Sequence, residues 1–166
     1  GNYENDQANG YGEYYFADGD CYKGNHLNGE AHGYGEYYFA NGSYYKGDYV
    51  NGARHGKGVL YDAANNIPYE GEFVNGKMNG LGVFQFKEGD RFEGEFYDGG
   101  TFYSKGKLWY PDGKLWFEGE YEECRPARGK VYRRDGSLWW DGGLCSAAFY
   151  DPRNGYVSYD HRGEPW

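Results

Sequence analysis

Three pairs of glutamates are the residues with the most evident capacity for chemistry. They are Glu70/Glu72, Glu93/Glu95 and Glu118/Glu120. Two neighbouring carboxylates could act as general acid and base, or bind a calcium ion. A catalytic pair would occur once, however, whereas these pairs recur along the chain in the same setting. We therefore interpret them as the solvated face of a repeated structure.

The histidines give no stronger indication of catalysis. The sequence contains His26, His32, His55 and His161. His32 and His55 occupy the same place in a repeat, which favours a structural role such as a hydrogen bond to a turn. The motifs of serine hydrolases, zinc peptidases and phosphate-binding loops do not occur. We expect no enzymatic activity, and neither a metal nor a cofactor.

Composition excludes several classes of partner and compartment. The net charge of −9 disfavours binding to nucleic acid or to an anionic membrane surface. Cys21, Cys124 and Cys145 are odd in number and lack CxxC spacing, so neither a disulfide framework nor a zinc site is indicated. No apolar run approaches the ~20 residues of a membrane span. These features favour a cytoplasmic protein.

Glycine and aromatic residues dominate the chain, with 30 glycines and 22% Phe, Trp and Tyr. An aromatic residue followed two positions later by glycine recurs every 23 to 25 residues. The recurrences are Tyr22-Lys23-Gly24, Tyr45-Lys46-Gly47, Tyr69-Glu70-Gly71, Phe92-Glu93-Gly94, Phe117-Glu118-Gly119 and Trp140-Asp141-Gly142. A period of this length indicates an array of small structural units.

Each unit contains two turn signals. Asn-Gly occurs at 28–29, 51–52 and 75–76, and Asp-Gly or a similar pair occurs at 18–19, 41–42, 88–89, 112–113 and 135–136. Such pairs favour the positive φ angles of tight hairpin turns, so each unit is predicted to be two antiparallel strands. The predicted fold is all-β, an elongated single-layer antiparallel sheet of consecutive hairpins with about 13 or 14 strands.

The alternation of side chains along a strand explains the glycines. Tyr69, Gly71 and Phe73 share one face of a strand, and the glutamates between them share the other. Rings from one strand can therefore lie across the glycine backbone of the next strand, which compensates for the missing side chains. The glycines expected in this role are Gly24, Gly33, Gly35, Gly47, Gly56, Gly58, Gly71, Gly80, Gly82 and Gly94.

The repeated unit resembles the MORN (membrane occupation and recognition nexus) repeat. It reads aromatic-x-Gly-Glu-aromatic, then Asn-Gly, His-Gly-x-Gly, an aromatic run and a second turn. The match is close over 22–44 and 45–58, and 69–91 matches with Asn79 in the place of the histidine. The resemblance implies a non-catalytic module that binds proteins, self-associates or accompanies a catalytic domain of a larger enzyme. It also implies a place in cytoskeletal, ciliary or membrane-associated assemblies.

The pattern diverges after residue 99. In the fourth unit Tyr103-Ser104-Lys105-Gly106 replaces His-Gly-x-Gly. We assign residues 1–144 to the repeat array, with about six to seven units. Residues 145–166 are assigned to a C-terminal capping hairpin, because terminal units of an array protect its open edge.

A single sheet leaves its aromatic side without a second layer, and exposed apolar surface of that size marks an interaction site. We therefore predict a scaffold or adaptor that binds a segment of a partner protein, such as an amphipathic helix, on the aromatic and glycine face. The expected contact residues are Tyr37, Phe39, Tyr45, Tyr49, Tyr69, Phe73, Phe84, Phe86, Phe92, Phe96 and Trp109.

Other binding functions stay open. An anionic phospholipid surface could contact a basic stretch, and carbohydrate or choline could bind between paired aromatic rings. A homodimer could form through an edge or the C-terminal end. The basic stretch comprises Lys105, Lys107, Lys114, Arg125, Arg128, Lys130, Arg133 and Arg134. Acidic residues interleave with it, and the first half of the chain has no Trp, so we favour a protein partner.

Overall fold

The computed structural model describes residues 2–4, 7–64, 67–86, 89–97, 99, 102–122 and 125–143. Within these residues, thirteen strands form one sheet in which each strand pairs with the next in sequence. The strands are β1 (Asn2–Glu4), β2 (Gln7–Tyr15), β3 (Cys21–Leu27), β4 (Glu30–Tyr38), β5 (Tyr44–Val50), β6 (Ala53–Asp62), β7 (Ile67–Val74), β8 (Lys77–Gln85), β9 (Arg91–Tyr97), β10 (Phe102–Trp109), β11 (Leu115–Glu122), β12 (Arg125–Tyr132) and β13 (Leu138–Gly143).

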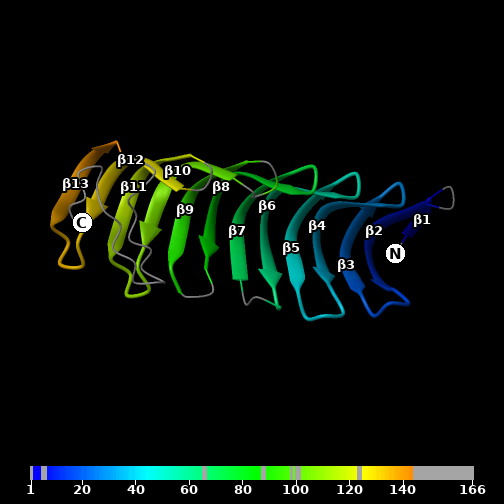
Figure 1. The fold of residues 1–166 in the computed structure, drawn as a ribbon. Coiled ribbons are helices and arrows are strands. Elements are labelled where there is room, and N and C mark those ends of the chain that lie inside the picture. The colour runs from blue at the N-terminus through cyan, green and yellow to red at the C-terminus, as the bar shows by residue number, and fades with distance from the viewer. Residues whose placement is uncertain are drawn as a thin grey trace.

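Figure 1 shows these strands side by side along the molecule, from β1 at one end to β13 at the other. The predicted fold, an elongated single-layer array of antiparallel hairpins, is confirmed. No described residues form a helix that is long and apolar enough to cross a membrane. The capping hairpin expected at 145–166 lies outside the described residues.

The two turn signals of each repeat produce two different turns. Asn28, Asn51 and Asn75 have φ angles of 52°, 48° and 49°, and the glycine after each also has a positive φ. Two successive positive φ angles define the two-residue hairpin turn that Asn-Gly favours.

The turn at 16–20 is one residue longer. The amide of Gly19 donates to the carbonyl of Phe16, and the amide of Phe16 donates to the carbonyl of Asp20. Gly19 has φ 96°, whereas Asp18 keeps a negative φ. The same pattern of bonds recurs at 39–43, 86–90, 110–114 and 133–137. Asp-Gly therefore closes a three-residue loop, with only its glycine in the left-handed region.

A continuous row of glycines crosses the sheet. Twelve strands, β2 to β13, each place one glycine opposite a glycine of the neighbouring strand. We call this line the glycine row; its members are Gly12, Gly24, Gly35, Gly47, Gly58, Gly71, Gly82, Gly94, Gly106, Gly119, Gly129 and Gly142.

Each hairpin covers its two row glycines with one aromatic ring. A Cβ atom added to Gly58 would lie 2.5 Å from Cε2 of Tyr45, and one added to Gly47 would lie 2.6 Å from the hydroxyl of the same tyrosine. Tyr22, Tyr69, Phe92 and Phe117 hold the corresponding place in the other hairpins. The glycines thus leave room for a ring to lie directly on the backbone of two strands.

These rings form the core of the protein, on the side of the sheet that we call the ring face. Tyr45 is 0% exposed and Phe73 is 1% exposed. Their rings meet edge to face at 5.0 Å between centroids, a favourable aromatic geometry. Burial raises the pKa of Tyr45 to about 12. The hydroxyl of Tyr45 donates to the carbonyl of Asp48, which satisfies its polar atom within the core.

Candidate interaction surfaces

Most of the expected contact residues lie inside the core of the ring face. Six of the eleven are at most 6% exposed, so a partner could reach them only by displacing their neighbours. They are Tyr45, Tyr49, Tyr69, Phe73, Phe92 and Phe96. Substitution of these residues therefore changes core packing rather than a contact surface.

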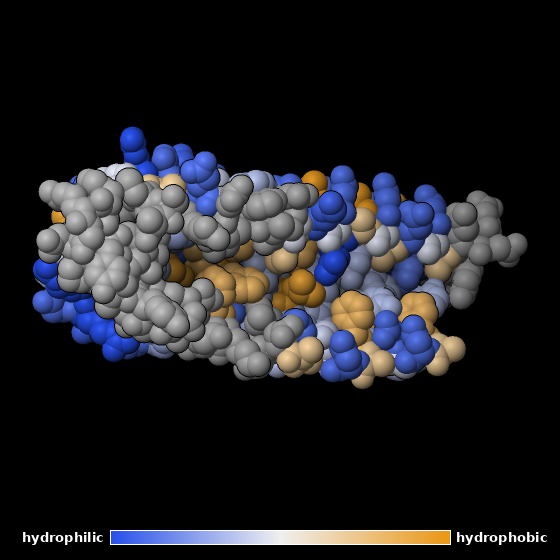
Figure 2. Space-filling model, viewed as in Figure 1, coloured by the Kyte–Doolittle hydropathy of each residue, from blue (hydrophilic) through white to orange (hydrophobic). Residues whose placement is uncertain are grey.

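The remaining rings of this face stay accessible. Phe39 is 38% exposed, and Tyr37, Phe84 and Phe86 are half-buried. The ring of Tyr37 lies between those of Phe39 and Phe16, with centroids 4.7 Å and 6.0 Å away. We call these five residues, Phe16, Tyr37, Phe39, Phe84 and Phe86, the ring-face rim. Figure 2 shows apolar side chains in the centre of the ring face and along its lower edge towards the N-terminal strands, with hydrophilic ones between and around them.

Phe16, which is 46% exposed, was not among the expected contact residues. The sequence could have indicated Phe16 as a contact residue, because it follows Tyr14-Tyr15 as Phe39 follows Tyr37-Tyr38. Tyr22 and Phe117 were missed in the same way, although they align with Tyr45 in the repeat.

A small hollow of about 240 Å³ opens beside the ring-face rim. Tyr37, Phe39 and Tyr49 line it together with Arg54. The guanidinium of Arg54 lies over the ring of Tyr45 at 5.4 Å and over that of Phe73 at 5.5 Å. Arg54 thereby covers these two core rings, and its positive charge is stabilised by cation–π contacts with their faces.

Trp109 lies on a different surface from the one expected. Leu108 packs against the ring core, and alternation then turns Trp109 to the opposite face. There the guanidinium of Arg91 lies 4.3 Å from the centre of the Trp109 ring. Alternation from Gly106 along β10, which stays in register with β9, already places Trp109 on this face, so the expectation was wrong.

The expected structural glycines fall into two classes. Seven of them belong to the glycine row, whereas Gly33, Gly56 and Gly80 lie outside it. These three have φ angles of 76°, 70° and 103°, which other residues rarely adopt. They pair across strands with Tyr49, Phe73 and Phe96, and the ladder on the other side of each strand shifts its register nearby.

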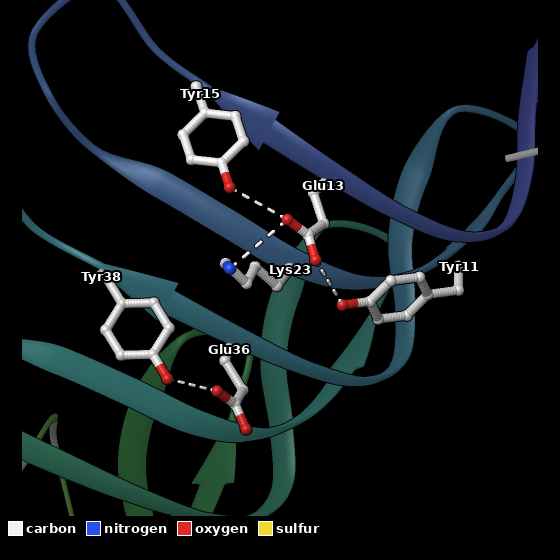
Figure 3. Close-up of polar contacts among 6 residues, drawn as sticks. All are labelled: Tyr11, Glu13, Tyr15, Lys23, Glu36 and Tyr38. Carbon is white, nitrogen blue, oxygen red and sulfur yellow. Dashed lines mark hydrogen bonds and ion pairs between the residues drawn. The ribbon is translucent and has the colours of Figure 1, made fainter.

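The face opposite the rings, which we call the charged face, begins with a polar clamp around Glu13 (Figure 3). Its carboxylate accepts hydrogen bonds from the hydroxyls of Tyr11, at 3.1 Å, and Tyr15, at 3.0 Å. Lys23 on the next strand lies 3.3 Å away. These hydrogen bonds, that from Tyr15 foremost, hold the pKa of Glu13 below its usual value.

The clamp is repeated one hairpin later around Glu36, which accepts a hydrogen bond from Tyr38 (Figure 3) and another from Tyr34. Lys46 lies 3.7 Å from this carboxylate and over the ring of Tyr38. In β6 the corresponding position is Val59, so the clamp ends there. The first two repeats thus tie adjacent strands together across the charged face.

An open groove of about 930 Å³ crosses the charged face from β4 to β10. Residues of the glycine row line it, between two lines of side chains. Five acidic residues and four lysines contribute to these lines, and Lys57 on β6 faces Glu72 within the groove. Among the described residues, no three histidine, cysteine or acidic side chains gather as a metal site would require.

The basic stretch does not form a single basic surface among the described side chains. Lys107 lies 3.7 Å from Glu118 on the charged face. The guanidinium groups of Arg133 and Arg134 instead lie over the rings of Trp139 and Tyr110. The basic stretch is therefore divided. Lys107 is paired with an acidic residue on the charged face, whereas Arg133 and Arg134 lie over aromatic rings on the opposite face.

The histidines of the first repeats are partly buried. His26 packs against the rings of Tyr14 and Tyr22, at 4.7 Å and 5.0 Å. The Nδ1 atoms of His26 and His32 are buried without a hydrogen-bond partner among the described residues. The hydrogen bond to a turn that we expected of His32 is therefore not made by this atom.

Comparison with known protein families identifies the same repeat that the sequence pattern indicated. The model of the MORN repeat family matches residues 1–21, 22–44, 45–66 and 69–91, more than half of the chain. No curated protein has significant sequence similarity to the chain. The glycine row and its covering rings continue beyond residue 91, through Phe92 and Phe117, so the architecture extends further than the recognisable sequence.

Solved structures are also similar to this chain, among them two from Drosophila melanogaster. The TCP domain of Drosophila melanogaster SAS-4, in complex with a proline-rich motif of Ana2, aligns with 77% of this chain and 69% of its own, at 13% identity and a TM-score of 0.50. The TCP10c domain of D. melanogaster Sas-4 aligns with 78% of this chain and 84% of its own, at 17% identity and a TM-score of 0.42. The family match and the hairpin array agree that this chain belongs to the MORN repeat proteins.

Proposed function

We propose that this chain is a non-catalytic scaffold that holds a segment of a partner protein against its ring face. The observation that carries the proposal is the ring-face rim, whose apolar rings remain accessible beside a closed core. All thirteen described strands lie in one sheet, so none of them covers the rim. Accessible apolar surface of this kind is typical of docking sites.

The hollow beside the rim suits an anchoring side chain. Its volume of about 240 Å³ accommodates one apolar side chain, and Tyr37, Phe39 and Arg54 are among the residues that line it. A single buried anchor surrounded by weaker contacts is how many protein interfaces gain most of their affinity. An amphipathic helix with one projecting apolar residue fits this arrangement.

Protein is favoured over lipid as the partner. Membership of the MORN family supports an interaction role, and the TCP domain, which shares the fold, is in complex with a motif of another protein. The net charge of −9 and the division of the basic stretch between two faces oppose adsorption to an anionic membrane.

The test is affinity capture from a native extract with three baits: wild type, Phe39→Ser/Phe86→Ser, and Val74→Ser. Val74 is 41% exposed, close to the 38% of Phe39, but lies outside the rim. Both changes affect accessible side chains, so the variants should stay folded by circular dichroism. We expect partners that are retained by wild type and Val74→Ser to be lost by the double variant. The same partners on all three baits would rule out the rim as the binding surface.

A further inference from the structure

The charged face carries a ladder of paired charges that is interrupted in the middle of the sheet. Near β2–β5, Glu13 and Glu36 pair with lysines of the following strands at 3.3 Å and 3.7 Å. Towards β11, Lys107 pairs with Glu118 at 3.7 Å. Between these regions, β6 and β8 place Val59 and Val83 at the ladder position.

The valines leave one carboxylate without an opposite charge. Glu70 faces Val59 on one neighbouring strand and Val83 on the other. It is exposed, and among the described residues it makes neither a hydrogen bond nor an ion pair. Glu93, on β9, faces Val83 on one neighbouring strand and Lys107 on the other, and its ion pair is with Arg91 of its own strand at 3.9 Å.

Apolar surface adjoins these carboxylates. Leu81 is 61% exposed on β8, between Glu72 and Glu95. Glu72 and Glu95 are engaged with the amide of Leu81 and the hydroxyl of Ser104. We call the part of the charged-face groove formed by Val59, Glu70, Leu81, Val83 and Glu93 the central groove. It combines an apolar floor with two exposed carboxylates, of which Glu70 faces valines on both neighbouring strands.

We propose that the central groove binds an extended, basic segment of a partner protein that runs across the strands. Lysine or arginine side chains would pair with Glu70 and Glu93, while their aliphatic stems and intervening apolar residues would cover Val59, Leu81 and Val83. Charge complementarity selects this occupant, because the groove offers carboxylates and apolar atoms together. This site lies on the face opposite the ring-face rim, so it is independent of the function proposed above.

The spacing of the two carboxylates specifies the segment further. Glu70 and Glu93 lie on strands two apart, a separation of about 9.4–9.8 Å at the usual strand spacing. A polyproline II helix advances about 9.3 Å in three residues and returns its side chain to the same side. Neighbouring side chains on one face of an α-helix are only about 5–6 Å apart. The matching segment is therefore extended, with basic residues at every third position.

The experiment is an NMR titration of the protein at low salt with the synthetic peptide Pro-Leu-Lys-Pro-Leu-Lys-Pro. The variants are Glu70→Gln/Glu93→Gln and, as a matched control on β4, Glu30→Gln. We expect the double variant to raise the Kd by about tenfold and the control to leave it unchanged. A peptide of the same composition with adjacent lysines should bind several-fold more weakly, because only one lysine can meet a carboxylate.

The same titration with Phe39→Ser/Phe86→Ser separates the two proposals, since those changes should leave the Kd for the basic peptide unaltered. Equal Kd values for wild type and Glu70→Gln/Glu93→Gln would overturn the proposal of a basic-segment site. Shifts confined to residues outside the central groove, or no shifts at millimolar peptide, would overturn it as well.

Discussion

Substitution of Gly71 by alanine is expected to lower the free energy of unfolding by about 3 kcal/mol, at the upper end for overpacked cores. A Cβ atom at this position would lie 2.5 Å from Cα of Gly82 and 2.6 Å from the carbonyl oxygen of Leu81. Both atoms belong to the backbone of β8, so relief requires the paired strands to move apart. Urea denaturation of the variant and of wild type gives the difference directly.

Gly143→Ala is the matched control for this substitution. Gly143 also lies in a strand, but a Cβ atom there would meet nothing within 4 Å. Its stability should stay within about 0.5 kcal/mol of wild type. Equal losses in Gly71→Ala and Gly143→Ala would mean that the strand backbones do not approach as closely as the glycine row requires.

Phe73→Ala is expected to cost about 3–5 kcal/mol, the range for removal of a large buried ring. Phe73 is 1% exposed and packs edge to face with Tyr45 and Tyr69, at centroid distances of 5.0 Å and 5.4 Å. Its removal would leave a cavity between two hairpins. Because a domain has only about 5–15 kcal/mol of stability, thermal unfolding of this variant should begin well below that of wild type.

Phe39→Ala removes a ring of the same size from the ring-face rim, where it is 38% exposed. We expect a loss of about 1 kcal/mol or less, since the site can relax and is partly solvated already. The melting curves of Phe39→Ala and Phe73→Ala therefore distinguish a ring of the rim from a ring of the core. Similar melting temperatures for both variants would show that the buried rings do not form the core described here.

The architecture was predictable because two simple signals agree along the chain. Asn-Gly at fixed intervals specifies hairpins, and the two-residue period places Tyr69, Gly71 and Phe73 on one face. A ring over bare glycine is the arrangement that makes such a face stable. Every repeat has the same pattern, so a wrong interpretation of one unit would not have changed the predicted fold.

The details of the binding surfaces were less predictable, because they depend on burial. Trp109 lies on the charged face, where alternation from Gly106 places it, so this expectation was wrong through a miscount along the strand. Counting along the chain, however, cannot tell that Phe73 and Phe96 are closed in while Phe39 and Phe86 are accessible. These differences arise from how neighbouring hairpins pack, and no single repeat contains that information.

The repeated and the divergent positions have different consequences for function. Repeated residues such as Tyr45 and Gly58 build the sheet, and their contacts are satisfied within it. Departures from the repeat, such as Val59 in place of the glutamate found in β2 and β4, create surfaces with unmet binding capacity. The central groove thus arises where the repeat is broken, whereas the ring-face rim consists of repeated positions.

Nuclear Overhauser contacts between aromatic rings and the glycine row test the account most directly. The structure predicts cross-peaks from the ring protons of Tyr45 to the Hα protons of Gly47 and Gly58, and from those of Tyr69 to Gly71 and Gly82. Gly52, at a turn with nothing within 4 Å of its Cβ position, should show no contact of this kind. A folded protein in which the row glycines lack these cross-peaks would contradict the claim that each ring covers two glycines.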